Sequence, residues 1–204
     1  MADDPRVTQW NERYAGDAYV FGETPNAFLA SQAALLRPGM TALAVADGEG
    51  RNGVWLAKQR LDVTSVDFSP VALSKSRKLA EREGVVVEAE CADLLMWNWG
   101  LARFDLVAVI FIQFGPAERA IFFDRLKAAL KPGGLVLLQA YTPKQLEYRT
   151  GGPPQLDHLY TEPMLRELFA GYTFLQLREH EEVLHEGKRH VGRSALIDLV
   201  ARKP

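Results

Sequence analysis

Cysteine is almost absent from this sequence of 204 residues, since Cys91 is the only one. A single thiol cannot form an intramolecular disulfide, so nothing in the sequence indicates an oxidising compartment. The N-terminal stretch, MADDPRVTQW, is polar and acidic, unlike a secretory signal, and no apolar run approaches the ~20 residues that a membrane-spanning helix needs. We therefore expect a cytoplasmic protein that does not enter a membrane.

An excess of charge of either sign is also missing. Lys and Arg number 24 against 26 Asp and Glu, which gives a formal net charge of −2, and no long basic run occurs. A nucleic-acid-binding surface needs a basic patch, so the sequence argues against a nucleic-acid partner. The four tryptophans are expected to pack in the core or a lid rather than to stack on bases.

Short motifs that mark several enzyme classes are absent as well. The sequence contains no G-x-x-x-x-G-K-[ST] and no G-x-S-x-G, which argues against nucleoside triphosphate chemistry and against a serine hydrolase. His185 and His190 bracket a polar turn without cysteine or carboxylate partners at the spacing of metal ligands. We expect both histidines on the surface and no metal site.

The stretch from Thr41 to Ala57, TALAVADGEGRNGVWLA, is the most informative part of the chain. A short apolar run, Leu43 to Ala46, is followed by Gly48 and Gly50 and then by apolar residues at helical spacing. This order predicts a strand, a tight loop and a helix. Glycine in such a loop lets the backbone approach a ligand, and the free N–H groups that open the next helix can bind an anion.

Strand and helix alternate along most of the chain at the spacing of βαβ units. The predicted strands cover 41–46, 62–67, 85–91, 104–110 and 135–141, and the predicted helices between them cover 53–59, 70–83 and 116–130. Two final runs, 173–184 and 194–201, predict an antiparallel hairpin. The expected fold is α/β, with a doubly wound, mostly parallel seven-stranded sheet that ends in the antiparallel hairpin.

The whole chain, residues 1–204, is expected to form one domain, in which residues 1–37 make an N-terminal helical cap or lid. The cap contains the aromatic and glycine-bearing segment 19–26, which is either a packed connector or a lid over a site. A long loop, 142–157, follows the fifth strand, and loops of this length are usually functional or mobile.

The glycine loop carries a ligand-binding pattern. Residues 48–53 read GEGRNG and satisfy G-x-G-x-x-G, and Asp67 ends the next strand at close to the expected ~20 residues. The pattern fits a dinucleotide as well as any other adenosine ligand, and its alternatives are a tight structural turn and a solvated loop acid. We favour a ligand site in which Asp67 accepts both hydrogen bonds of a ribose diol, because ligands bind at the carboxyl ends of strands in open α/β sheets.

Five motifs in order resemble those of the class I S-adenosylmethionine-dependent methyltransferases. They are the glycine loop, VDFSP at 66–70, ADL at 92–94, FDLV at 104–107 and LKPGG at 130–134. The resemblance covers nearly the whole chain and implies the Rossmann-like methyltransferase fold, whose sheet also ends in an antiparallel pair. Three further strings, WNERY, YVFGETPNAFL and TPKQLEYRTGGP, are similar to the small bacterial branch near tellurite-resistance and thiopurine methyltransferases.

The resemblance also implies S-adenosyl-L-methionine as the cofactor. By that resemblance Gly48 and Gly50 would approach its methionine part and Asp67 its ribose hydroxyls. Phe68 would cover the adenine face, and Asp93 would accept from the adenine amino group. The full set expected to bind the cofactor is Asp47, Gly48, Gly50, Arg51, Asn52, Asp67, Phe68, Asp93, Leu94 and Ile110.

The glycine loop departs from the family at two positions. Ala44 stands where the first strand of the family usually ends in an acidic residue, and Ala46 replaces the first glycine of the loop. A missing carboxylate could leave a donor unpaired at a cost of ~1–3 kcal/mol. Asp47 either replaces the lost negative charge or is simply solvated, and the sequence leaves both interpretations open.

Methyl transfer mainly requires that nucleophile, methyl carbon and sulfur be aligned and that water be excluded. A thiolate needs no base, whereas an oxygen or nitrogen acceptor usually does. Candidates for the catalytic and acceptor side are Tyr19, Gln113, Tyr141, His158 and Tyr160. Tyr19 and Phe21 would place aromatic faces beside the sulfonium, and His158 is either a base or a solvated loop residue.

These observations predict a methyltransferase that acts on a small molecule, with a thiol or a chalcogen anion as the acceptor, in a monomer or a homodimer. A non-catalytic module that binds S-adenosylmethionine or S-adenosylhomocysteine is one alternative, motivated by Ala44 and Ala46. A nicotinamide-dependent oxidoreductase is the other. It is less well supported, because the sequence contains no Tyr-x-x-x-Lys pair and has no room for a second, substrate-binding domain.

Overall fold

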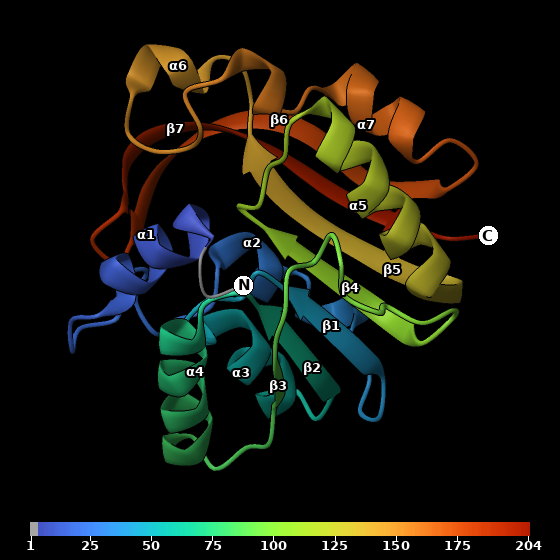
Figure 1. Cartoon of the computed structure of the whole chain (residues 1–204). Coiled ribbons are helices and arrows are strands. Elements are labelled where there is room, and N and C mark those ends of the chain that lie inside the picture. The colour runs from blue at the N-terminus through green and yellow to red at the C-terminus, as the bar shows by residue number, and fades with distance from the viewer. Residues whose placement is uncertain (1–3) are drawn as a thin grey trace.

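A seven-stranded sheet in the order β3-β2-β1-β4-β5-β7-β6 runs through the computed structural model, which describes residues 4–204 (Figure 1). The strands are β1 (Thr41–Val45), β2 (Asp62–Asp67), β3 (Glu88–Cys91), β4 (Phe104–Ile110), β5 (Leu130–Tyr141), β6 (Thr173–Glu186) and β7 (His190–Arg202). Strands β1 to β5 pair in parallel, whereas β7 pairs antiparallel with β5 and with β6. The predicted sheet with its C-terminal antiparallel hairpin is confirmed.

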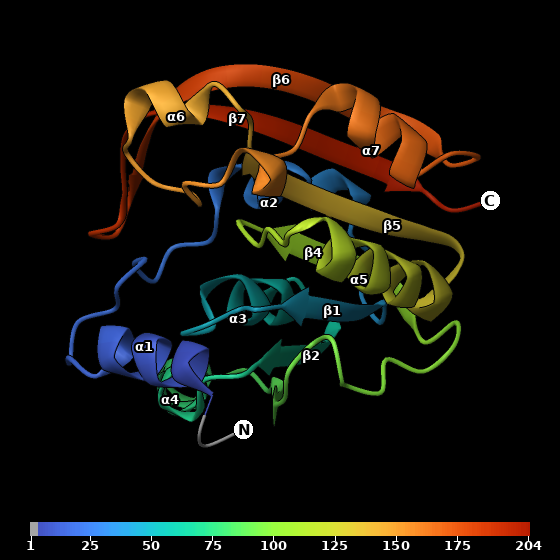
Figure 2. The same ribbon diagram turned by 45° about the horizontal axis from the view of Figure 1, so that its top comes forward.

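Helices cover both faces of this sheet (Figures 1 and 2). They are α1 (Pro5–Tyr14), α2 (Ala27–Ser31), α3 (Arg51–Lys58), α4 (Pro70–Arg82), α5 (Pro116–Ala129), α6 (Gln145–Tyr148) and α7 (Glu162–Leu168), with 3-10 turns η1 (Ala33–Leu35) and η2 (Leu156–His158). Among the described residues, no helix is both long enough and apolar enough to cross a membrane.

The two faces of the central strands are packed against different helices, because successive side chains of a strand point to opposite sides. Val107 of β4 belongs to the buried cluster that contains Phe122 of α5, whereas its neighbour Leu106 belongs to the cluster that contains Leu56 of α3. Burial on both faces explains why the sequence of β4 is almost entirely apolar.

Helix α1 lies beside α4, at the edge of the sheet rather than over its centre (Figure 2). The helix begins after Asp4, whose side chain accepts a hydrogen bond of 2.8 Å from the Arg6 N–H. Ser69, which caps α4, donates its hydroxyl to Asn11 Oδ1 over 2.7 Å. The N-terminal segment is thus attached directly to the βα connection that follows β2.

Several predicted boundaries differ from the structure. The strand expected at 85–91 begins only at Glu88, and the helix expected at 53–59 already begins at Arg51. In the N-terminal cap, α2 ends at Ser31, whose hydroxyl donates back to the Phe28 carbonyl, and a 3-10 turn follows. The KPGG segment ends α5 as expected, but β5 already begins at Leu130, which pairs with Phe104 across a bulge. Strands β6 and β7 are longer than predicted, and this lengthening moves the hairpin turn to residues 187–189. In an antiparallel pair with one solvated face, polar residues alternate with apolar ones. The apolar runs in the sequence are therefore shorter than the strands themselves.

Candidate functional site

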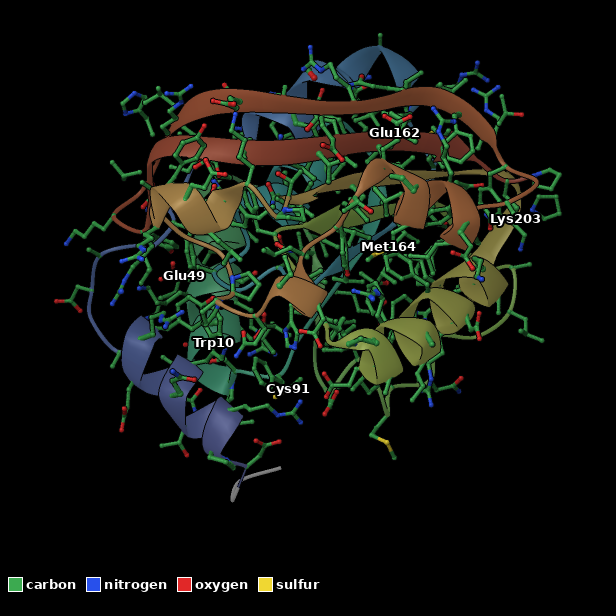
Figure 3. The ribbon with its side chains drawn as sticks, turned by 90° about the horizontal axis from the view of Figure 1, so that it is seen from above. Trp10, Glu49, Cys91, Glu162, Met164 and Lys203 are labelled. Carbon is green, nitrogen blue, oxygen red and sulfur yellow. The ribbon has the colours of Figure 1, made fainter. Side chains whose placement is uncertain are left out.

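A cleft of about 740 Å³ opens at the carboxyl ends of the central strands. The ends of β1, β2, β3 and β4 contribute Asp47, Asp67, Asp93 and Ile110 to its walls. Figure 3 shows Trp10 of α1 and Glu49 of the glycine loop on the same side of the molecule, and both line the cleft. The cleft therefore lies where ligands bind in doubly wound α/β folds.

The glycine loop turns sharply between β1 and α3. Ala46, Gly48 and Gly50 have positive φ angles of 47°, 58° and 90°. A Cβ added at Gly48 would lie 2.8 Å from the Tyr14 hydroxyl, so a side chain at this position would displace the Tyr14 ring. Helix α3 begins at Arg51, and its first turn lines the cleft. The backbone N–H groups of this turn can bind an anion.

Asp67 fixes the loop from the neighbouring strand. The Gly48 N–H donates to its Oδ2 over 2.9 Å, and the Ser69 N–H donates to its Oδ1 over 2.8 Å. Burial raises the pKa of this carboxyl to about 6, against the opposing effect of these hydrogen bonds. Each oxygen of an ionised carboxylate can accept a second hydrogen bond, so Asp67 can also receive a diol from the cleft.

Asp47 is buried within the loop rather than solvated, since only 8% of it is exposed. Its Oδ2 accepts from the Gly53 N–H (3.0 Å) and the Ser65 hydroxyl (3.2 Å). Its Oδ1 is buried and has no hydrogen-bond partner among residues 4–204. Burial raises the pKa of Asp47 to about 7. The interpretation of Asp47 as a merely solvated acid is therefore wrong, and one of its oxygens has no partner among the described residues.

Glu49 is a lining residue that the sequence analysis did not single out. Its side chain is buried, accepts from the Val20 N–H over 2.6 Å and forms an ion pair with Lys75 of α4 over 2.5 Å. These contacts attach the connector 19–26 to the glycine loop. The glycine pattern allows any residue at position 49, so the sequence does not indicate that Glu49 is buried. Its partners, Val20 and Lys75, come from distant segments.

Most residues predicted to bind the cofactor are brought together in the cleft. Its walls include Asp47, Gly48, Arg51, Asn52, Asp67, Phe68, Asp93, Leu94 and Ile110. Asp93 also pairs with Arg6 of α1 over 3.1 Å. Gly50 lies outside the cleft, where an added Cβ would come within 2.2 Å of the Ser76 hydroxyl, so its small size serves the packing of the loop on α4.

Three of the five candidates for the acceptor side line the cleft, and two do not. Gln113, Tyr141 and His158 line the cleft. The Gln113 side chain donates to the backbone carbonyls of Tyr141 and His158 and accepts from the Tyr141 N–H, so it braces the cleft wall. The Tyr141 hydroxyl is buried without a hydrogen-bond partner in the described part of the chain, and burial raises its pKa above the usual value.

Tyr19 and Tyr160 lie outside the cleft. The Tyr19 hydroxyl donates to the Lys75 carbonyl over 3.0 Å, and the Lys75 ammonium lies 4.9 Å from the centre of its ring. Tyr160 is fully buried in the main core beside Phe123. Of the two aromatic residues expected beside a sulfonium, only Phe21 lines the cleft.

His190 lines the cleft, so its expected position on the surface is wrong. Its ring centre is 4.4 Å from that of Phe111 and 4.5 Å from that of Phe21. The cause is the greater length of β6 and β7, which brings the hairpin end against the connector 19–26, where the Lys188 N–H donates to the Val20 carbonyl over 2.8 Å. His185, on the other side of the turn, is exposed as predicted.

A buried ion pair joins this hairpin to the glycine loop. The Arg51 guanidinium contacts Glu186 Oε2 over 2.6 Å, and the two side chains are 7% and 10% exposed. Glu186 Oε1 accepts from the Asn26 side chain over 3.0 Å, and the same amide group donates to Gln139 of β5 over 2.7 Å. The position of the hairpin is therefore fixed by buried polar contacts with α3, the N-terminal segment and the sheet.

Comparison with known proteins agrees with this geometry. Residues 42–134 match the family model described as a methyltransferase domain. An uncharacterized protein of Mycobacterium tuberculosis is 29% identical over 111 residues, which cover 54% of this chain and 40% of that protein.

Two solved structures share the fold along nearly the whole chain. TehB from Haemophilus influenzae superposes with a TM-score of 0.73 at 19% identity, over 98% of this chain and 67% of TehB. A structure from work on the conversion of a disulfide bond into a thioacetal group during echinomycin biosynthesis gives a TM-score of 0.75 at 20% identity, over 97% of this chain and 91% of that one.

The family match and the shared fold agree with each other. Residues 42–134 match a methyltransferase domain, and the chain has the Rossmann-like fold of the two solved structures. The class that the sequence motifs indicated is confirmed. The mycobacterial relative is matched over less than half of its own length, at 40%.

Proposed function

We propose that this protein transfers a methyl group from S-adenosyl-L-methionine to a small molecule, and that the acceptor is a soft nucleophile. The observation that carries the proposal is the meeting of the glycine loop with two buried carboxylates, Asp47 and Asp67, at the carboxyl edge of the sheet. A nucleotide-like ligand with a ribose and an ammonium group matches these two acids. When bound, the cofactor supplies an electrophilic methyl group.

The residues in the cleft suit this cofactor. The unpartnered Oδ1 of Asp47 can accept from an ammonium group, which replaces the acid missing at Ala44. The first turn of α3, which begins at Arg51, lies where a carboxylate can meet backbone N–H groups. Asp67 would receive the ribose hydroxyls, and Phe68 would cover the adenine ring. Asp93, Leu94 and Ile110 would form the rest of the adenine site.

The acceptor end of the cleft is aromatic, which suits a reaction at a sulfonium. Phe21, Phe111 and Tyr141 line it, and the rings of Phe111 and Tyr141 stack with centres 4.9 Å apart. Aromatic faces attract a sulfonium charge and exclude water. The sulfur chemistry named for the echinomycin-related structure supports a thiol as the acceptor by analogy.

Calorimetric titration with S-adenosylmethionine, S-adenosylhomocysteine and NADH, after removal of any copurified ligand, tests the proposal. Both adenosyl ligands are expected to bind and NADH is not. Asp67→Asn is expected to weaken S-adenosylhomocysteine by more than tenfold, because a hydrogen bond to a charged group contributes about 1.5–3 kcal/mol. Asp62→Asn, an exposed acid at the opposite end of β2, is the matched control and should leave the affinity unchanged.

The outcomes separate the alternatives. Absence of adenosyl binding at millimolar concentration, which corresponds to only about −4 kcal/mol, would overturn the proposed cofactor. Binding of NADH alone would favour an oxidoreductase. Binding without turnover of any thiol, amine or hydroxyl probe would favour a non-catalytic binding module.

The affinity for S-adenosylhomocysteine is expected to fall as the pH is lowered through about 7. Burial raises the pKa of Asp47 to about 7, and only its ionised form attracts the ammonium group. Asp67, with its pKa raised to about 6, adds a second and lower step. In Asp47→Asn the step near pH 7 should disappear while the one near pH 6 persists. An identical pH dependence in the variant would show that Asp47 does not bind the ligand.

A further inference from the structure

His190 has the surroundings of a proton acceptor. Its ring lies between Phe21 and Phe111 and lines the cleft, while only 14% of its side chain is exposed. Nδ1 is buried and faces Glu186 Oε2 at 3.5 Å, and within residues 4–204 it has no other partner and no hydrogen bond of normal geometry. One ring nitrogen is therefore directed at an acid, and the other is available to a molecule in the cleft.

Glu186 is suited to orient this ring. Arg51 and Asn26 hold its carboxylate in place through contacts of 2.6 Å and 3.0 Å. Burial alone would raise the pKa of Glu186, but His190 and Arg51 outweigh it and lower the pKa, so the carboxylate is charged at neutral pH. A charged acid beside Nδ1 favours the tautomer with the proton on Nδ1 and leaves Nε2 unprotonated.

The groups around His190 also favour its neutral form. Burial lowers the pKa of His190, Glu186 of β6 opposes this effect, and the positive charge of Arg51 on α3 adds to it. Tyr141 of β5, whose ring centre lies 6.1 Å away, is uncharged at neutral pH because burial raises its pKa. A neutral imidazole can accept a proton, whereas an imidazolium cannot.

We propose that His190, oriented by Glu186, accepts the proton of the methyl acceptor, and that the acceptor is therefore a protonated nucleophile, in the first place a thiol, rather than a preformed anion. This inference rests on the proposed methyltransferase function. It also selects between the two acceptor types, because a chalcogen oxyanion needs no base and a thiol in an apolar cleft does.

For a thiol acceptor, the S–H proton moves to Nε2 of His190, and the sulfur keeps the electron pair. As the new sulfur–carbon bond forms to the methyl group, the carbon–sulfur bond of the sulfonium breaks, and the products are a methyl thioether and S-adenosylhomocysteine. His190 then releases its proton to solvent through the exposed part of its side chain. No oxidant, reductant or metal takes part.

His158 is the competing histidine in the cleft, and the structure favours His190. The acid nearest to His158 is Asp157, at 3.9 Å, and the Asp157 side chain is 64% exposed. An exposed acid is screened by water and can turn away, so it does not fix a tautomer. Glu186 is instead held by two partners in the interior.

The test compares two thiols that differ in acidity, 4-nitrothiophenol, which is ionised at neutral pH, and phenylmethanethiol, which is not. His190→Gln is expected to lower kcat for phenylmethanethiol by at least about 100-fold, the usual contribution of a positioned base. Turnover of the ionised thiol should change by less than about threefold, since no proton has to be removed from it. His185→Gln, at the exposed end of the same turn, is the matched control and should leave both rates unchanged. Equal losses with both thiols in His190→Gln would mean that His190 only shapes the cleft and would overturn the proposal.

A second measurement tests His190 without any acceptor. In the complex with S-adenosylhomocysteine, ¹⁵N NMR at neutral pH is expected to show a neutral imidazole with the proton on Nδ1. An imidazolium, or a proton on Nε2, would overturn the proposal even if no thiol is turned over. Failure of S-adenosylhomocysteine to bind the wild-type protein would instead count against the proposed function, so the two failures are distinguishable.

Discussion

Gly50→Ala is expected to lower the free energy of unfolding by about 2–5 kcal/mol, the sum of ~1–2 for a side chain in the left-handed region and about 1–3 for overpacking. Gly50 has a φ of 90° and caps the N-terminus of α3. The new Cβ would lie 2.2 Å from the Ser76 hydroxyl and 2.9 Å from the Ser76 Cα, so rotation of the serine side chain cannot remove the clash. Urea denaturation measures the loss.

Gly39→Ala is the matched control for this prediction. Gly39 has a similar φ of 84°, and an added Cβ there would have no heavy atom within 4 Å among the residues that the structure describes. It should therefore lose only the conformational part, about 1–2 kcal/mol. Equal losses at the two positions would show that the contact between the glycine loop and α4 does not limit the size of residue 50.

Glu186→Ala should lower the free energy of unfolding by about 3–5 kcal/mol, the range for removal of one member of a buried ion pair. The change would leave the Arg51 guanidinium buried beside a cavity and deprive Asn26 of an acceptor. The double variant Arg51→Met/Glu186→Leu should recover most of this loss, because no charge then remains buried. Thermal and urea unfolding of the three variants provide the measurement.

An exposed ion pair serves as the control. Glu162 and Arg166 of α7 are 2.7 Å apart, with side chains 40% and 53% exposed. Glu162→Ala should change the free energy of unfolding by no more than ~1 kcal/mol, since water screens such a pair. If Glu186→Ala were as mild as Glu162→Ala, the hairpin end would not be held by its charge.

Local sequence signals were sufficient for the sheet and for the acidic residues that line the cleft at the ends of its strands. Asp47, Asp67 and Asp93 each follow an apolar strand, and the carboxyl ends of parallel strands meet at one edge, so spacing alone placed them together. The short apolar runs of the parallel strands are likewise local features.

The acceptor side could not be derived in the same way. His190 reaches the cleft, and Glu186 reaches Arg51, only because β6 and β7 extend past their apolar parts, and the polar residues there resemble a solvated turn. The connector 19–26 is irregular, so no repeating pattern indicates which way its side chains point. The sequence therefore could not show that Phe21 lines the cleft whereas Tyr19 packs on Lys75. Contacts between distant segments decide these positions.

The polar contacts that hold the hairpin over the glycine loop have a consequence for folding kinetics. Glu186 meets Arg51 across 135 positions of sequence and Asn26 across 160. Closing loops of this size lowers the conformational entropy before the contacts that offset this loss have formed. Contacts of high sequence separation therefore form slowly. The parallel strand pairs close shorter loops, so the sheet is expected to assemble before the cleft is complete. A cofactor that binds only the complete cleft would then stabilise the last species on the folding pathway and leave the earlier ones unaffected.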